Sequence, residues 1–185
     1  MEDLSLHILD IVENSLRANA KNIEVRLIQN EEKDQLILEV IDDGEGMNEE
    51  TVRQSLDPFF TTKTGKKVGL GLPFLVQAAE EADGELKVES IEGRGTRVVV
   101  TFRLSHVDRK PLGNVEETMK CLKATHPEVS FRFEHVRPRD LKSPTSIHPH
   151  ACEISDFEHC PTFGGGVRAA SVGQFSHTRP AIGTF

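Results

Sequence analysis

Apolar residues recur at helical spacing over residues 4–20, and this pattern predicts an amphipathic helix. One broad side of that helix holds its apolar residues, which are Ile8, Leu9, Ile11, Val12 and Leu16. Apolar and polar residues then alternate through 23–27, as in a strand with one buried face. Residues 36–41 are nearly all apolar, which is typical of a central strand. The chain therefore begins with a predicted helix and two strands.

The middle of the chain combines turns with two shorter helices. Residues 42–47 form a glycine-rich turn, and Asn48 suits the N-cap of a helix that ends near Leu56. Residues 57–69 follow neither period, so we predict a long loop there. A further helix is predicted over residues 70–82, and Gly84 shortly after it marks its end.

Two more strands are predicted at residues 85–90 and 96–104, joined as a hairpin by a glycine-containing loop. After them the pattern weakens, although 114–125 fits a helix capped by an asparagine and 129–136 fits a strand. From Pro138 onward the sequence is rich in proline, glycine and histidine and has no period. We expect this last region to be mostly disordered or loosely attached.

Length and charge narrow the class of protein. A chain of 185 residues suits one domain with an appendage, and its formal charge of −8 argues against nucleic acid or an anionic membrane as the main partner. There is no apolar run near the roughly 20 residues that a membrane span needs, and no signal peptide is expected. The three irregularly spaced cysteines favour a reduced, cytoplasmic protein over a disulfide framework.

Three polar residues form a stripe on the first helix. Asp10, Asn14 and Arg17 lie at i, i+4 and i+7, which places them within about 60° of one another. An asparagine oxygen suits magnesium, an arginine can fork onto phosphate oxygens, and a carboxylate can accept a proton from an attacking hydroxyl. The stripe therefore suits a nucleotide, although the solvated face of any amphipathic helix also carries such residues.

An acidic turn follows the predicted central strand. The strand delivers Asp42 to its end, where Gly44 and Gly46 let the backbone turn sharply and approach a flat ligand. A buried carboxylate at this position can accept a hydrogen bond from the exocyclic amine of adenine. The alternative is the Asp-Gly turn of a plain hairpin. A helix, however, rather than a matching strand, is predicted next.

A third motif combines the long loop with glycines at the start of a helix. Gly69 and Gly71 stand where the helix over 70–82 begins, and backbone N–H groups at a helix start bind anions. Three cations lie just upstream, at Lys63, Lys66 and Lys67. The loop could serve as a lid over phosphates, or it could be only a flexible basic loop.

The order and spacing of these motifs carry more information than any one of them. The chain contains, in this order, DIVENSLRANA, DDGEGM, DPFFTTK, GLGL and EGRGT. This series resembles the ATPase superfamily that contains histidine kinases, anti-sigma-factor kinases, the ATPase domains of DNA gyrase B and HSP90, and MutL. The resemblance spans residues 4 to about 104. It implies an α/β two-layer sandwich of the Bergerat type, with helices on one face of a mixed, mainly antiparallel sheet.

The resemblance also implies roles for individual residues. Asn14 would bind magnesium, Arg17 would contact phosphate, and Asp42 would pair with adenine, with support from Gly44 and Gly46. The other implied ATP-binding residues are Met47 in the acidic turn, Phe60 and Lys63 in the FFTTK lid, Gly69, Leu70, Gly71 and Leu72 in the glycine box, and Thr96 near the adenine, reached through water.

The sequence departs from this family at the position of the catalytic base. The family usually carries glutamate four residues before the magnesium asparagine, whereas this chain has Asp10, which is one methylene shorter. Glu13 lies about 60° away from Asp10 around the helix. His7 lacks the acidic and proline neighbours of a phosphoacceptor, so we interpret it as a structural or surface residue. We therefore expect another protein to supply the phosphoacceptor.

Two functions fit these features, and both use ATP and Mg²⁺. The first is a kinase that transfers the γ-phosphate in trans to His, Ser or Thr of a regulatory protein. The second is a non-catalytic, ATP-gated binding module. A slow ATPase that drives dimer opening, as in MutL, would need a second domain for which the chain offers no convincing candidate. The expected partners are thus ATP and a regulatory protein, without nucleic acid or a membrane span, and the sequence does not fix the oligomeric state.

We divide the chain into an ATPase domain at 1–104, a small βα extension at 105–136 and a tail at 137–185. The tail contains a cluster of metal-ligand types, which are His148, His150, Cys152, His159 and Cys160. Their spacing matches no zinc finger, so a chance clustering is the alternative to a zinc site.

Overall fold

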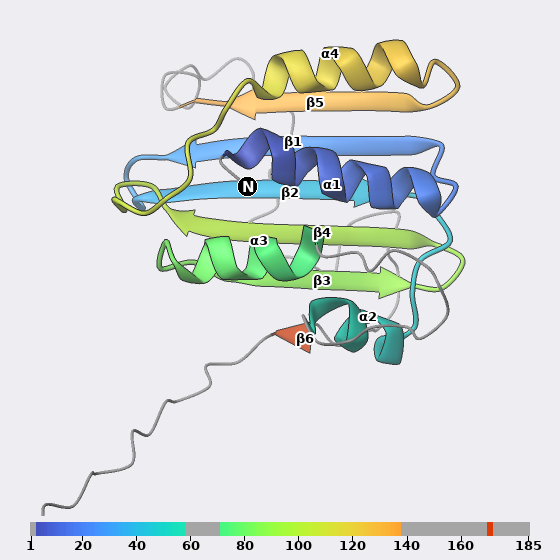
Figure 1. Cartoon of the computed structure of the whole chain (residues 1–185), viewed down its shortest axis with the longest axis horizontal. Coiled ribbons are helices and arrows are strands. Elements are labelled where there is room, and N and C mark those ends of the chain that lie inside the picture. The colour runs from blue at the N-terminus through green and yellow to red at the C-terminus, as the bar shows by residue number, and fades with distance from the viewer. Residues whose placement is uncertain (1–2, 58–70, 138–169, 172–185) are drawn as a thin grey trace, which may run out of the picture.

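The computed structural model describes residues 3–57, 71–137 and 170–171. The helices in these ranges are α1 (Leu4–Arg17), α2 (Glu49–Leu56), α3 (Gly71–Glu80) and α4 (Val115–Thr125). The strands are β1 (Asn22–Asn30), β2 (Gln35–Asp42), β3 (Leu86–Ile91), β4 (Gly95–Arg103), β5 (Ser130–Val136) and β6 (Ala170–Ser171). The strands form one sheet in the order β5-β1-β2-β4-β3-β6 (Figure 1).

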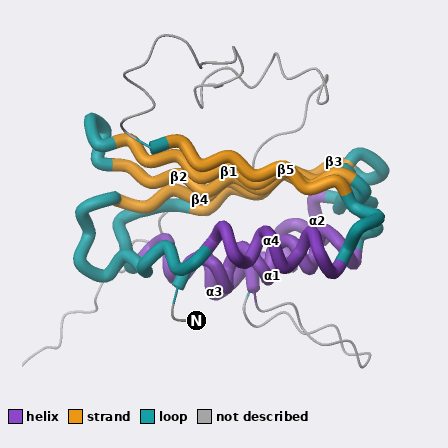
Figure 2. Tube along the Cα trace, turned by 90° about the horizontal axis from the view of Figure 1, so that it is seen from above, coloured by secondary structure: helices purple, strands orange, loops and turns teal. Residues whose placement is uncertain are grey.

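The elements stack in two layers. All four helices lie on one face of the sheet, as the view along its edge shows (Figure 2). Strand β5 runs parallel to β1, and the other neighbouring strands are antiparallel. This arrangement confirms the predicted two-layer α/β sandwich with a mixed, mainly antiparallel sheet.

Helix α1 begins and ends at residues suited to those positions. The Asp3 carboxylate accepts a hydrogen bond from the Leu6 N–H and caps the helix. The helix ends at Arg17, three residues earlier than the sequence pattern predicted. It stops there because Asn19 adopts a left-handed φ of 60° and turns the chain, while the Ala20 N–H donates to the Ser15 carbonyl.

The core lies between the helices and the sheet. Alternate residues of β1 and β2 point toward the helices, and the alternation predicted over 23–27 is therefore confirmed. The largest fully buried side chains come from both layers and include Ile8, Val12, Leu27, Leu38, Leu75 and Phe102. Burial of this apolar face holds α1 in place against β2, where the polar stripe of the helix is needed.

The other face of the sheet carries ion pairs. The Glu39 carboxylate accepts a hydrogen bond of 2.6 Å from the Arg97 guanidinium and a longer one of 3.3 Å from Arg26. The Glu39 side chain is only 8% exposed. The strand that reads as apolar in the sequence therefore buries one charge, because two arginines on the neighbouring strands neutralise it.

The region after the hairpin forms a helix and a strand, α4 and β5. Asn114 caps α4 by accepting from the Glu117 N–H, and β5 then extends the sheet beside β1. The Leu4 N–H donates to the Pro111 carbonyl, so the segment between β4 and α4 also holds the start of α1. The predicted division near residue 104 stays a prediction. Of the predicted tail, only residues 170–171 and Arg137 lie among the described residues, and β6 was not predicted.

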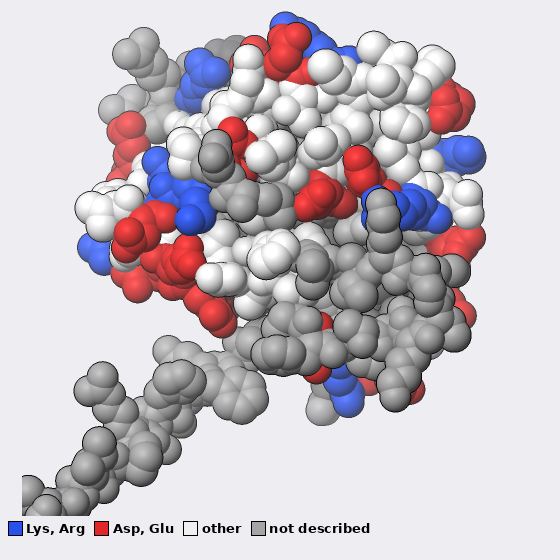
Figure 3. All heavy atoms as spheres, viewed as in Figure 1, with Lys and Arg blue, Asp and Glu red and all other residues white. Residues whose placement is uncertain are grey.

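Charges of both signs are interspersed on the helical face. The space-filling view shows acidic and basic side chains next to one another between areas of uncharged residues, with no broad basic patch on the described part of this face (Figure 3). Within the described ranges, none of the helices is long and apolar enough to cross a bilayer.

Candidate nucleotide site

Helix α1 brings the three sequence motifs together. On one side, the Ser15 hydroxyl donates a hydrogen bond of 2.6 Å to the Asp42 carboxylate at the end of β2. On the other side, α1 meets the start of α3, where a methyl group placed on Gly71 would lie 3.0 Å from Cβ of Asp10. The polar stripe of α1 thus lies between the acidic turn and the glycine box.

Asp42 is a fixed acceptor at the end of its strand. The side chain is buried, and its Oδ1 accepts from the Gly44 N–H at 2.9 Å while its Oδ2 accepts from Ser15. Thr96 lies directly opposite Asp42 on β4. The Thr96 hydroxyl is 2.8 Å from the Ser90 hydroxyl. Two neighbouring strands therefore present a carboxylate and a hydroxyl side by side, and both groups can form hydrogen bonds.

The turn after Asp42 leaves no room for side chains at its glycines. A Cβ on Gly44 would lie 2.8 Å from the Ala18 carbonyl oxygen. Gly46 has a φ of 67°, and its Cβ would lie only 2.0 Å from the Ile91 carbonyl oxygen. The Met47 N–H donates to the Ser90 hydroxyl at 2.8 Å and anchors the end of the turn. The turn is therefore held against both α1 and β3.

The stripe on α1 contains a cation that bridges two of its neighbours. The Arg17 guanidinium contacts the Glu13 carboxylate at 2.7 Å and donates to the Asn14 Oδ1 at 3.0 Å. Asn14 thus offers a neutral oxygen, the kind of ligand that suits magnesium. Glu13 is occupied by Arg17, whereas Asp10 faces Gly71. Of the two acidic residues, Asp10 is the one directed at the start of α3.

The surroundings of Asp10 change the pKa of its carboxyl. Partial burial raises the pKa of the Asp10 carboxyl, and the nearby Glu13 charge raises it further, while Arg17 acts in the opposite direction. The net result is a pKa above the ordinary value for aspartate. Such a carboxyl binds a proton more readily than a solvated one, as a group that accepts a proton during a reaction should.

Some predicted residues lie outside the described part of the chain. These are Phe60, Lys63, Lys66, Lys67, Gly69 and Leu70, with all but the first residue of the loop predicted over 57–69, and the whole histidine and cysteine cluster of the tail. Gly71 and Leu72 open α3, and the Leu72 side chain packs in the core, so only its backbone can face a ligand. No group of three or more metal-binding side chains (His, Cys, Asp or Glu) occurs in residues 3–57, 71–137 and 170–171.

The structure adds Ser15 and Ser90 to the residues found from the sequence. Ser15 lies on the apolar side of α1, three residues after Val12, and is 3% exposed. A buried hydroxyl on an apolar face needs a partner, so this position carried a signal that the sequence patterns left unused. His7 is 2% exposed and belongs to the core side of α1, which matches a structural role better than a surface one.

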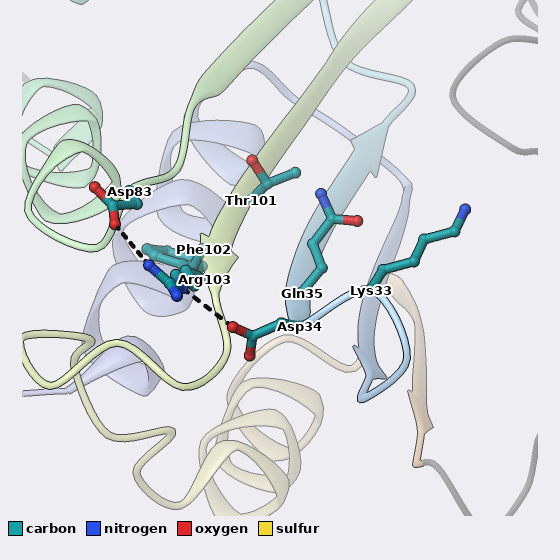
Figure 4. Close-up of a pocket in the computed structure, with 7 residues that line it drawn as sticks. All are labelled: Lys33, Asp34, Gln35, Asp83, Thr101, Phe102 and Arg103. Carbon is teal, nitrogen blue, oxygen red and sulfur yellow. Dashed lines mark hydrogen bonds and ion pairs between the residues drawn. The ribbon is translucent and has the colours of Figure 1, made fainter.

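A separate hollow lies at the far end of the sheet. It is a pocket of about 250 Å³ between the start of β2, the end of β4 and the turn before β3 (Figure 4). Arg103 bridges Asp34 at 3.1 Å and Asp83 at 3.3 Å across it. Gln35 and Arg103 are at the ends of their strands opposite to Asp42 and Thr96. The pocket is therefore distinct from the place where the three motifs meet.

The chain matches a known protein family over most of the elements described above. The family model for the histidine kinase-, DNA gyrase B- and HSP90-like ATPases matches residues 2–106 of the sequence. The chain belongs to this ATPase family. The matched residues form an ATP-binding domain of this family and include the described parts of the motifs discussed above.

Individual relatives are bacterial signalling kinases. The chain is 36% identical to sporulation kinase C of Bacillus subtilis over 52% of its own length and 22% of that kinase. It is 34% identical to the sensor protein kinase FleS of Pseudomonas aeruginosa over 60% of its length and 27% of FleS. It therefore spans about a quarter of the length of these relatives.

The fold has a solved counterpart. The Aquifex aeolicus MutL ATPase domain complexed with ADP matches the chain over 73% of the chain and 60% of the domain structure, with 20% identity and a TM-score of 0.50. At this level of identity the likeness concerns the fold alone.

Proposed function

We propose that this ATPase binds Mg-ATP between α1, the acidic turn and the start of α3, and transfers the γ-phosphate to a regulatory protein in trans. The observation that carries the proposal is the position of α1. Its Ser15 holds the Asp42 carboxylate at 2.6 Å, and its Asp10 lies against Gly71. One rigid helix thus links an adenine acceptor to a phosphate-binding helix start.

Each end of the nucleotide meets its own set of residues in this proposal. Asp42 accepts a hydrogen bond from the exocyclic amine of adenine, and Thr96 contacts the adenine beside it through a water molecule. Because Gly44 and Gly46 have no side chains, the adenine ring can approach the backbone of the turn closely. Met47 lies at the end of the same turn. At the other end, Arg17 binds phosphate oxygens, and the first N–H groups of α3, from Gly71 and Leu72, face the phosphates.

Asn14 is the proposed ligand of magnesium. Its Oδ1 is a neutral, hard oxygen that already accepts from a cationic donor, Arg17 at 3.0 Å, so the position tolerates positive charge. Magnesium, when bound with ATP, supplies neutralisation of the phosphate charge. Arg17 then exchanges Asn14 for a phosphate oxygen while Glu13 continues to orient its guanidinium.

Asp10 is the proposed general base. The carboxylate accepts the proton of the attacking hydroxyl or imidazole of the partner protein. The oxygen or nitrogen of that group bonds to the γ-phosphorus while the bond from γ-phosphorus to the bridging oxygen breaks and ADP leaves. Because Asp10 is one methylene shorter than glutamate, it depends on close approach to α3. Gly71 permits that approach, since a side chain there would press on Asp10.

The decisive experiment follows labelled phosphate. The full chain is incubated with γ-labelled ATP and Mg²⁺, alone and with proteins from the same cell. Label on a partner protein that disappears in the Asp10→Asn variant supports phosphoryl transfer. Tight binding of Mg-ATP with no transfer of label, unchanged in Asp10→Asn, would contradict it and leave the ATP-gated binding module.

The Asp10→Asn variant should retain ATP binding but lose transfer by about 10²- to 10⁴-fold, which is the usual contribution of a general base. Its fold should become slightly more stable at neutral pH. The raised pKa means that the native state of the unaltered chain loses stability as the pH rises and Asp10 ionises. The amide avoids this cost. Calorimetric binding of ATP and thermal unfolding measure both effects.

The pH profile gives a second check on Asp10. Transfer should increase with pH as Asp10 ionises, with a midpoint above the ordinary pKa of aspartate. In Glu13→Gln the like charge is removed, so this midpoint should move to lower pH. An identical midpoint in both chains would show that the titrating group is not Asp10.

The ATP-gated module is the second candidate function, and the pairing of Arg17 favours it. Magnesium at Asn14 competes with Arg17 for the same oxygen, so nucleotide binding alone changes the exposed surface of α1. A partner that reads this surface would respond to ATP without chemistry. Capture of one protein with ATP and not with ADP, without transfer of label, would identify this function.

A further inference from the structure

Strand β5 lies at the edge of the sheet. Within residues 3–57, 71–137 and 170–171 it pairs with β1 alone. The Ser130 N–H donates to the Lys21 carbonyl at 2.8 Å. In a parallel ladder, alternate residues direct their backbone groups toward the neighbouring strand, so Arg132 and Glu134 also face β1. Phe131 and Phe133 then direct their N–H and C=O groups away from the sheet.

The side chains on this strand carry opposite charges two residues apart. Arg132 is 65% exposed and lies 3.6 Å from Glu24, and Glu134 is 50% exposed and lies 3.8 Å from Arg26. These contacts are long and exposed, so they are weak. Both charges are therefore able to take a closer partner at the edge.

We propose that the edge of β5 binds β5 of a second copy of this chain, antiparallel, about a two-fold axis at Phe133. In this register Arg132 lies opposite the partner's Glu134, and Glu134 lies opposite the partner's Arg132. Residues on the same face of antiparallel strands contact each other directly, so two intermolecular ion pairs form.

The charges select this register over its neighbours. An axis at Arg132 would place it against the partner's Arg132, and an axis at Glu134 would place it against the partner's Glu134. Both arrangements oppose like charges. The axis at Phe133 also matches the backbone, because Phe133 directs its N–H and C=O outward to those of the partner's Phe133. Arg132 and Glu134 then form the non-hydrogen-bonded pairs, whose Cα atoms approach to about 4.5 Å.

The self-complementary charges favour a second copy over a strand from another protein. Across a two-fold axis, this one pair of residues forms the Arg132–Glu134 contact twice. Another protein would have to carry the same charges in the same order on its own strand. The pairing would join two sheets into one, with both copies of α4 on the same face. Such an edge contact is small, so the dimer should be weak and dependent on concentration.

Charge reversal tests the proposal on the full chain. Sedimentation equilibrium should show a monomer–dimer equilibrium with a dissociation constant of about 1–100 µM. Arg132→Glu and Glu134→Arg should each weaken the dimer about 10- to 30-fold, since each replaces two attractions by two repulsions. The double variant Arg132→Glu/Glu134→Arg should restore dimerisation to within about three-fold.

The double variant is a strict control. It disrupts both the contact to Glu24 and the contact to Arg26 within each copy, whereas each single variant disrupts one of them, so restored dimerisation can come only from the contact between copies. A chain that stays monomeric at about 1 mM would overturn the proposal. Single reversals without effect, or a double variant that fails to recover, would also overturn it.

Hydrogen exchange of the unaltered chain gives an independent readout. The Phe133 amide should exchange slowly at high protein concentration and lose this protection on dilution below the dissociation constant. Equal exchange at all concentrations would contradict the pairing. The Asp42→Asn variant should dimerise normally, because β5 is separated from β2 by β1. Dimerisation is thus tested separately from ATP binding.

Discussion

Replacing Asp42 with asparagine is expected to lower the affinity for ATP by about 100-fold or more. Both oxygens of the carboxylate already accept hydrogen bonds, from Ser15 and from the Gly44 N–H. An asparagine must turn its NH₂ group toward one of these donors or toward the amine of adenine. The Gly44 N–H can only donate and therefore keeps the amide oxygen, whereas the Ser15 hydroxyl can accept from the NH₂ group and donate to the Ile11 carbonyl. The carboxylate oxygen beside Ser15 is then replaced by a donor, so the amine of adenine loses its acceptor there.

Asp43 provides a matched control for this change. Its carboxylate accepts from the backbone of Lys21 and Asn22 and from the Asn22 side chain. Burial acts to raise the pKa of Asp43, but the hydrogen bonds from Asn22 and Lys21 outweigh it and hold the pKa below the ordinary value. Asp43→Asn should therefore destabilise the fold by about 1–2 kcal/mol and leave ATP binding intact.

Isothermal titration with Mg-ATP measures the affinity of both variants, and denaturant unfolding measures their stability. The two substitutions remove the same charge one residue apart, so a change in general electrostatics would affect them equally. Retained micromolar affinity in Asp42→Asn would refute the assignment of the adenine acceptor. Loss of affinity in Asp43→Asn alone would move it by one residue.

Gly46→Ala should lower the free energy of unfolding by about 3 kcal/mol or more and disable the site. The residue has a φ of 67°, and the added methyl would lie 2.0 Å from the Ile91 carbonyl oxygen. Because that oxygen belongs to the backbone of β3, it cannot turn aside as a side chain could. The turn must move as a whole, which displaces Asp42 and Met47.

Gly93→Ala separates the two causes of this loss. Gly93 has a similar φ of 78°, but a methyl group there meets nothing within 4 Å. It should cost only the strain of a left-handed alanine, about 1 kcal/mol. Urea unfolding of the two variants, with ATP titration, tests the difference. Equal losses of stability would mean that φ alone, rather than the contact with Ile91, fixes the glycine at position 46.

Local patterns were sufficient for most of the elements. The apolar spacing of α1 and the alternation of β1 depend on which face is buried, and that information is written in consecutive residues. The end of α1 was predicted three residues too late, because the chain turns at Asn19 with a left-handed φ of 60°, which the spacing of apolar residues does not reveal. β6 was missed because two residues carry no period.

The motifs located the candidate site, but the contacts within it are tertiary. Nothing in the sequence pairs Ser15 with Asp42, which is 27 residues away, or Glu39 with Arg97, which is 58 residues away. The pairing of Arg17 with Glu13 follows from helical spacing and could have been predicted. The sequence left open whether Asp10 or Glu13 faces the phosphates. The contact between Asp10 and Gly71 favours Asp10.

The parallel pairing of β5 with β1 has a consequence for how the chain folds as it is made. β1 ends at Asn30, and its partner begins about 100 residues later at Ser130. At about 5–20 residues per second, a ribosome needs several seconds to make that stretch. During this time α1 and the antiparallel strands can already assemble, while the outer side of β1 waits uncovered. β5, which lies outside the matched ATPase region, therefore docks after the central strands are made, and a nascent chain halted near residue 106 would expose β1 to other chains.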